Sequence, residues 1–88
     1  MAREFRYYVI VSDVEPRDNP YALVRVWGPD RGIPNEEFFS PRLVWERNSI
    51  LNQIGHGSMD REPEQITERE VEHYVEVLTR RFKAQQES

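Results

Sequence analysis

Glu70 and His73 are the pair of side chains whose spacing comes closest to a metal-binding motif. Residues three apart share one face of a helix, and Glu-x-x-His is one arm of the di-iron sites built into helical bundles. Such sites need a second arm and further glutamates on other helices, whereas this chain of 88 residues contains a single long helical pattern. There is also no cysteine to supply a thiolate ligand. We therefore predict neither a metal nor another cofactor.

Other side chains capable of catalysis lack the surroundings that catalysis needs. Four of the five serines lie in turn or capping patterns, and no serine lies in a nucleophile elbow. The paired carboxylates Glu36 and Glu37 lie among polar residues, where little would move a carboxyl pKa toward neutrality. His56 lies between two glycines, without the lysine of a phosphate-binding loop. We predict that the protein is not an enzyme. A small enzyme using His56 or His73 with neighbouring acids is a third alternative.

The aromatic and arginine residues indicate binding instead. Tryptophan, tyrosine and arginine are the residue types that contribute most to protein–protein affinity, and nearly all basic residues of this chain are arginine. We predict a protein-binding surface formed by Tyr8, Arg25, Trp27 and Trp45. The alternative is a single-stranded nucleic acid stacked on Arg6, Tyr8, Arg25 and Trp27, which we expect to share one face of the sheet. Aromatic rings and arginines on a sheet bind unpaired bases.

Composition narrows the classes of partner. The formal net charge is −4, and 32% of the residues are charged. This acidic balance makes nucleic acid an unfavourable partner, because affinity for duplexes comes largely from Lys and Arg on phosphates. No apolar run approaches the roughly 20 residues of a membrane span, and the first residues show no signal-peptide pattern. We expect a cytoplasmic protein without membrane contact.

Three extended segments are expected to form an antiparallel sheet within residues 5–47. Residues 5–11 and 21–27 are rich in aromatic and β-branched side chains, which favour strands, and turn-forming residues 12–20 separate them. A third extended stretch over residues 36–45 is interrupted by Pro41, which predicts an edge strand or a bulge. The short loops favour an antiparallel meander in chain order.

A long helix is expected after the sheet. Thr67 and Glu70 form a capping box, and Ile66 can pack on Val71 as a hydrophobic staple, so the helix should begin at Glu68. Its apolar stripe predicts a helix that ends near residue 84, followed by a frayed tail over residues 85–88; the stripe comprises Val71, Tyr74, Val75, Leu78 and Phe82. Between sheet and helix, residues 48–66 are expected to form a short helical turn, Ile50 to Ile54, and a loop.

These elements make one α+β domain over residues 1–88, with the helix on one face of the sheet. The first two strands carry apolar residues on both faces, and one helix covers only one face. The second face therefore requires the segment Ile50 to Ile54, a partner protein or a second copy of the chain. We accordingly predict a non-enzymatic binding or regulatory module that binds another protein, itself as a homodimer, or both.

Four short segments carry a resemblance to a known family: YYVIVSD (7–13), PYAL (20–23), EFFS (37–40) and LVWE (43–46), with Ser49. Their strand and turn patterns, which span roughly residues 7–82, resemble those of small uncharacterised proteins from actinobacteria and their phages. It implies no activity, cofactor or catalytic residue. A phage source would favour a protein that binds and redirects a host protein.

Overall fold

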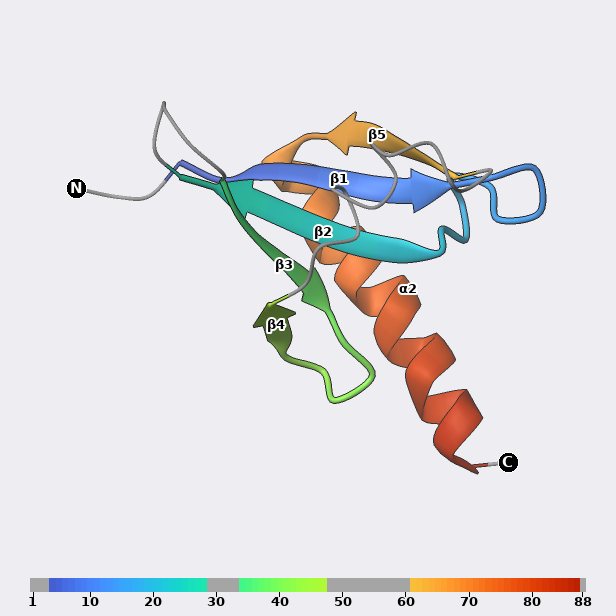
Figure 1. The fold of residues 1–88 in the computed structure, drawn as a ribbon. Helices are drawn as coiled ribbons and strands as arrows, with labels where there is room; N and C mark the ends of the chain where they lie inside the picture. The colour runs from blue at the N-terminus through green and yellow to red at the C-terminus, as the bar shows by residue number, and fades with distance from the viewer. Residues whose placement is uncertain (1–3, 29–33, 48–60, 88) are drawn as a thin grey trace.

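A five-stranded antiparallel sheet and one helix make up the described part of the chain. The computed structural model describes residues 4–28, 34–47 and 61–87. The strands lie in the order β4-β3-β2-β1-β5, with the C-terminal helix on one face (Figure 1). The elements are β1 (Arg6–Val11), β2 (Ala22–Trp27), β3 (Asn35–Phe39), β4 (Trp45–Arg47), β5 (Glu62–Ile66) and α2 (Glu68–Glu87). The predicted α+β class and antiparallel pairing are confirmed, but the predicted number of three strands is wrong.

The predicted third strand is two strands joined by a tight turn. Ser40 donates its N–H to the Val44 carbonyl at 3.0 Å, and Leu43 donates its N–H to the Ser40 carbonyl at 2.8 Å. Leu43 has a φ of 62°, an uncommon conformation for a branched residue, and this reverses the chain between β3 and β4. Pro41 therefore lies in a turn and not within an edge strand.

The other missing strand is β5, within the segment expected to be a loop. It pairs with β1 from Tyr7 opposite Ile66 to Val11 opposite Glu62, and so becomes an edge of the sheet. Its sequence, EPEQI, has no alternating apolar pattern, and Pro63 argues against a strand. The pairing places β1 between β2 and β5. The expected helical turn over residues 50–54 lies outside the described residues.

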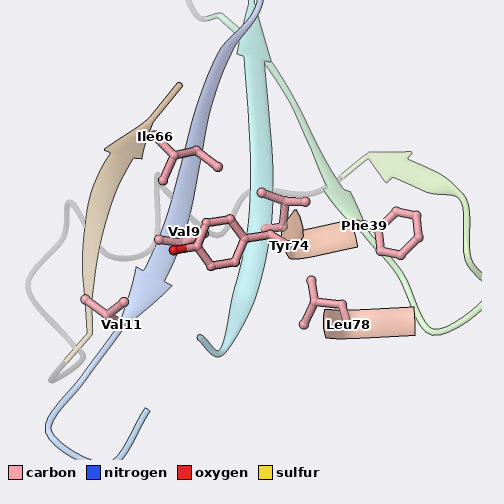
Figure 2. Packing of buried hydrophobic residues seen from close by; sticks show 7 residues of the cluster. Val9, Val11, Phe39, Ile66, Tyr74 and Leu78 are labelled. Atoms are coloured by element: carbon pink, nitrogen blue, oxygen red, sulfur yellow. The ribbon is translucent and has the colours of Figure 1, made fainter. Parts of the chain in front are cut away.

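The helix packs as its apolar stripe predicts. Tyr74 and Leu78 are buried in a cluster with side chains from β1, β2, β3 and β5, and Val71, Val75 and Phe82 pack against it. Figure 2 shows Tyr74 and Leu78 facing this cluster, beside Val9 and Phe39. The helix continues to Glu87, beyond the predicted end near residue 84. At its C-terminal end the Gln86 side chain donates to the Pro41 carbonyl at 3.4 Å, which joins this end to the β3–β4 turn.

The N-terminal cap of α2 differs in one bond from the expected capping box. The Glu70 carboxylate accepts the Thr67 backbone N–H at 3.0 Å, as predicted. The Thr67 hydroxyl, however, donates to the same carboxylate at 3.2 Å, and the Glu70 N–H donates to the Thr67 carbonyl. Glu70 therefore provides both side-chain contacts of the cap, and these contacts fix the start of the helix at Glu68.

The second face of the sheet is buried at its centre within the single chain. Ile10 and Val24 are fully buried there, Ala22 and Val26 nearly so, and Tyr8 and Phe38 pack against them. Packing therefore does not require a partner protein or a second copy on this face. Homodimer formation stays a prediction, but an uncovered second face of the sheet no longer supports it.

Gly28 ends β2 in a conformation that other residues rarely adopt. Its φ is +155°, and a Cβ atom would lie 3.1 Å from Pro34 Cα and 3.2 Å from the Asn35 nitrogen. We expect Gly28→Ala to lower the free energy of unfolding by about 1–2 kcal/mol, measured by urea denaturation. Val44→Ala, at an exposed site, should change it by less than about 0.5 kcal/mol. A Gly28→Ala variant as stable as the wild type would contradict this backbone geometry.

Candidate functional site

Arg25 lies at the centre of a group of residues brought together by three strand pairings. In the register of the sheet, Tyr7 of β1 and Glu37 of β3 lie directly beside Arg25 on its two sides. Residues alternate between the two faces of a strand, so these three side chains share the face that carries α2. Trp27 lies two positions further along β2 on the same face, and Trp45 enters from β4 opposite Phe39.

Arg25 and Glu37 form a half-buried ion pair. Arg25 Nε donates to Glu37 Oε1 at 2.9 Å, and Arg25 Nη2 lies 2.7 Å from the same oxygen. The side chains are 24% and 19% exposed, so water screens this pair less than it would a surface pair. The carboxylate of Glu37 therefore largely neutralises the positive charge of Arg25.

Three aromatic rings surround the Arg25 guanidinium. Its Cζ lies 4.3 Å from the centroid of the Trp45 ring, 4.7 Å from that of Phe5 and 6.0 Å from that of Trp27. A cation over the face of an aromatic ring gains about 0.5–1 kcal/mol at an exposed site and more when it is desolvated. Because arginine is planar and always charged, it can contact several rings at once.

The rings also contact one another, and they form a continuous surface. Phe5 meets Trp27 edge to face at 5.3 Å and Tyr7 at 6.0 Å, and Tyr7 lies 6.5 Å from Trp45. We call these four rings, together with Arg25 and Glu37, the aromatic cluster. Such ring pairs contribute about 0.5–1.5 kcal/mol beyond the area they bury, so these contacts stabilise the arrangement of the cluster.

The aromatic cluster lies where the helix leaves the sheet uncovered. Tyr7 and Trp45 pack against the buried core, whereas Phe5 and Trp27 are not part of it. In Figure 1, α2 runs away from the end of the sheet at which β1 begins and β2 ends. All four rings are half-buried, with one side on the protein and part of each ring in solvent.

An open hollow of about 460 Å³ adjoins the aromatic cluster. Phe5, Tyr7 and Ile66 provide its apolar lining, and Thr67 and Glu68 at the start of α2 are among its polar neighbours. It lies at the junction where β5 ends beside β1 and the chain turns into the helix. Its volume falls within the range of sites that hold small molecules or several side chains.

The structure brings together three of the four predicted site residues. Arg25, Trp27 and Trp45 meet in the aromatic cluster, but Tyr8 lies on the opposite face, because Tyr8 pairs with Val24 and not with Arg25. The same register separates the residues of the nucleic-acid alternative: Arg6 and Tyr8 are on one face, and Arg25 and Trp27 are on the other. The expectation that those four share a face is therefore wrong.

Sequence reasoning missed Phe5, Tyr7 and Glu37. Phe5 and Tyr7 alternate with Val9 and Val11, which identified their common face but not its match to the face of Arg25. A shift of one residue in the pairing of β1 with β2 exchanges the two faces, and the long loop between these strands did not fix the register. Glu37 required the β2–β3 register as well.

The other candidate side chains have structural partners or lie apart. Glu70 caps α2 and pairs with Arg17, and His73 is exposed with its ring 5.1 Å from that of Tyr74. Across the residues that the structure describes, no three potential metal ligands gather in one place. His56 lies outside these residues. Among the described helical residues, no segment has the length and apolarity to cross a membrane.

Arg25→Met tests the ion pair at the centre of the aromatic cluster. We expect it to lower the free energy of unfolding by about 1–2 kcal/mol, because Glu37 loses its partner and the rings lose the cation. The double variant Arg25→Met, Glu37→Leu should recover part of this loss, because it leaves no unpaired charge. Urea denaturation measures both. A single variant as stable as the wild type, or a double variant with the summed loss of two single variants, would contradict the proposed pairing.

Comparison with known proteins gives no family for this chain. No protein-family model, no curated protein and no solved structure matches it. The aromatic cluster and its geometry therefore provide the basis for a functional proposal.

Proposed function

We propose that the protein is a non-enzymatic module that binds another protein through the aromatic cluster. The observation that carries this proposal is the placement of Arg25 among Phe5, Trp27 and Trp45, within 6.0 Å of each ring centroid. Trp, Tyr and Arg dominate the residues whose removal costs most in protein–protein binding. Here they form a single half-buried surface at the uncovered end of the sheet.

The contacts that these side chains already make with one another favour binding. Side chains that are ordered only on association cost about 0.5–1.5 kcal/mol each, and ordering them beforehand removes that cost. In the chain without a partner, Trp27 already contacts Phe5, and Trp45 already contacts Tyr7 and Phe39. The neighbouring hollow could accept an apolar side chain of the partner against Phe5 and Ile66.

The charges of the aromatic cluster support a protein partner over a nucleic acid. Binding to phosphates requires arginines that are free to contact them, but Arg25 is paired with Glu37. Arg6 lies on the opposite face, so one strand could not contact Arg6 and Trp27 across the same surface. The nucleic-acid alternative therefore lacks the shared face on which it depended.

The proposal can be tested by capturing partners from cells of the source organism or its host. The immobilised protein should retain a protein that Trp27→Ala retains far less well and that Tyr21→Ala retains fully. Tyr21 is the matched control, since it is an exposed aromatic residue at the other end of β2. If both variants lose the captured protein, or if neither does, the aromatic cluster is not the surface that binds it.

Self-association needs a separate measurement, because the partner can be a second copy of the chain. Light scattering over a range of concentrations gives the solution mass of the wild type and of Trp27→Ala. If the copies meet at the aromatic cluster, the wild type should form a dimer that the variant forms more weakly. A dimer of unchanged strength in the variant would place the self-contact elsewhere.

A further inference from the structure

Residues 12–19, in the loop between β1 and β2, are folded into two successive turns. Glu15 donates its N–H to the Ser12 carbonyl at 3.2 Å, and the Ser12 hydroxyl donates to the Glu15 carboxylate at 3.0 Å. Asn19 donates its N–H to the Pro16 carbonyl at 2.9 Å. These bonds lie within residues 12–19, whereas Tyr21 donates its N–H to the Ile10 carbonyl at 2.8 Å and so attaches the end of the loop to β1.

Among the described residues, three arginine side chains join residues 12–19 to β5, α2 and the segment just before β5. Arg61, just before β5, donates to Glu15 at 2.9 Å and stacks over the Tyr21 ring at 3.8 Å. Arg17 of the loop lies 3.1 Å from Glu64 of β5 and 3.2 Å from Glu70 of α2. Arg81 of α2 donates to the Asn19 side chain at 3.0 Å and to the Tyr21 carbonyl at 3.3 Å.

Apolar packing contributes little to holding the loop. Val14, at its tip, is 84% exposed, and Pro16 is also exposed; only Pro20, next to β2, is fully buried. The sheet and helix, in contrast, are held by side chains with no exposure at all, such as Val9, Leu23 and Leu78. Ion pairs at a half-exposed surface contribute much less to stability than a buried apolar core.

We propose that residues 12–19 form a strap, latched by Arg17, Arg61 and Arg81, that opens while the sheet and helix stay folded. Opening separates Arg61 from the Tyr21 ring and exposes the side of α2 that carries Glu70 and Arg81. The strap follows the end of β1 and precedes the start of β2 (Figure 1), whereas the aromatic cluster lies where β1 begins and β2 ends. This inference therefore does not depend on the proposed function.

The titration of the latch agrees with this geometry. The hydrogen bond from Arg61, with the charges of Arg61 and Arg81, holds the pKa of Glu15 below its usual 4.5. The Thr67 backbone N–H and Arg17 lower the pKa of Glu70, and Glu70, Tyr74 and Glu64 raise that of Arg17. A carboxyl whose folded pKa is lowered stabilises the folded state above its unfolded pKa. This contribution disappears as pH falls through the folded value, so the latch should weaken below about pH 4.5.

Hydrogen exchange with residue resolution tests the strap. In the wild type, the Glu15 and Asn19 amides should exchange more than about tenfold faster than the Val9 and Leu23 amides. Their exchange should also depend little on low concentrations of urea, because local opening exposes little surface. The core amides should show the full urea dependence of global unfolding.

Variants identify the latch itself. Arg61→Gln should accelerate exchange at Glu15 and Asn19 by about two- to fivefold, and 1 M NaCl should act in the same direction by screening the pairs. Arg80→Gln is the matched control, since it breaks the exposed Arg80–Glu76 pair on α2 and should leave both amides unchanged. Three results would overturn the proposal: loop amides with the rate and urea dependence of the core, no effect of Arg61→Gln, or an equal effect of Arg80→Gln.

Discussion

Replacing Leu78 by alanine is expected to lower the free energy of unfolding by about 2–5 kcal/mol. Leu78 has no exposed surface and lies between α2 and the sheet, in the cluster that includes Leu23 and Phe39. Truncation removes its apolar contacts and leaves a cavity that the sheet cannot fill, because strand positions are fixed by hydrogen bonds on both sides. Urea denaturation followed by circular dichroism gives the change.

Val77→Ala is the matched control for Leu78→Ala. It removes apolar atoms from the adjacent position of the same helix, but Val77 belongs to neither buried cluster and remains partly exposed. We expect a loss below about 1 kcal/mol. Domains of this size are stable by only about 5–15 kcal/mol, so Leu78→Ala should remove a large share. Equal losses for the two variants would contradict the docking of α2 through this stripe.

Trp27→Ala is expected to weaken partner binding by about 2 kcal/mol or more, which is roughly 30-fold in Kd. Trp27 contacts Phe5 and lies beside Arg25 but is not part of the buried core, so the fold should survive the change. Trp45→Ala should weaken binding as well, but Trp45 also packs against the core, so its effect combines binding with stability. Isothermal titration with the captured partner measures both.

Tyr21→Ala should leave the affinity within about twofold of the wild type, because Tyr21 lies at the opposite end of the sheet. Thermal unfolding of each variant separates loss of binding from loss of folding. A Trp27→Ala variant that is folded and binds with wild-type affinity would contradict the proposal that the aromatic cluster is the binding surface.

The elements with strong periodic patterns could be predicted from the sequence, and the weak ones could not. The stripe from Val71 to Phe82 and the cap at Thr67 and Glu70 identified α2, and the runs at 5–11 and 21–27 identified β1 and β2. The edge strand β5 has no apolar alternation and contains Pro63, so only its pairing with β1 defines it. A strand that depends on its neighbour for stability shows only a weak strand pattern in its own sequence.

The unknown strand register likewise limited how much of the candidate site could be predicted from the sequence. The residue types of Arg25, Trp27 and Trp45 were enough to select them, but no feature of the sequence fixed the pairing of β1 with β2. The observed register places Tyr7 beside Arg25 and moves Tyr8 to the other face. The alternation along each strand could be predicted, whereas the match between strands depended on the whole sheet.

The tryptophan indole signals give the most direct test of binding at the aromatic cluster. The chain has two tryptophans, Trp27 and Trp45, and both lie in this cluster, so the protein has two indole N–H resonances in an NMR spectrum. The proposal predicts that both shift or broaden on titration with the captured protein, or on concentration if the partner is a second copy. A partner that binds and leaves both resonances in place would contradict it.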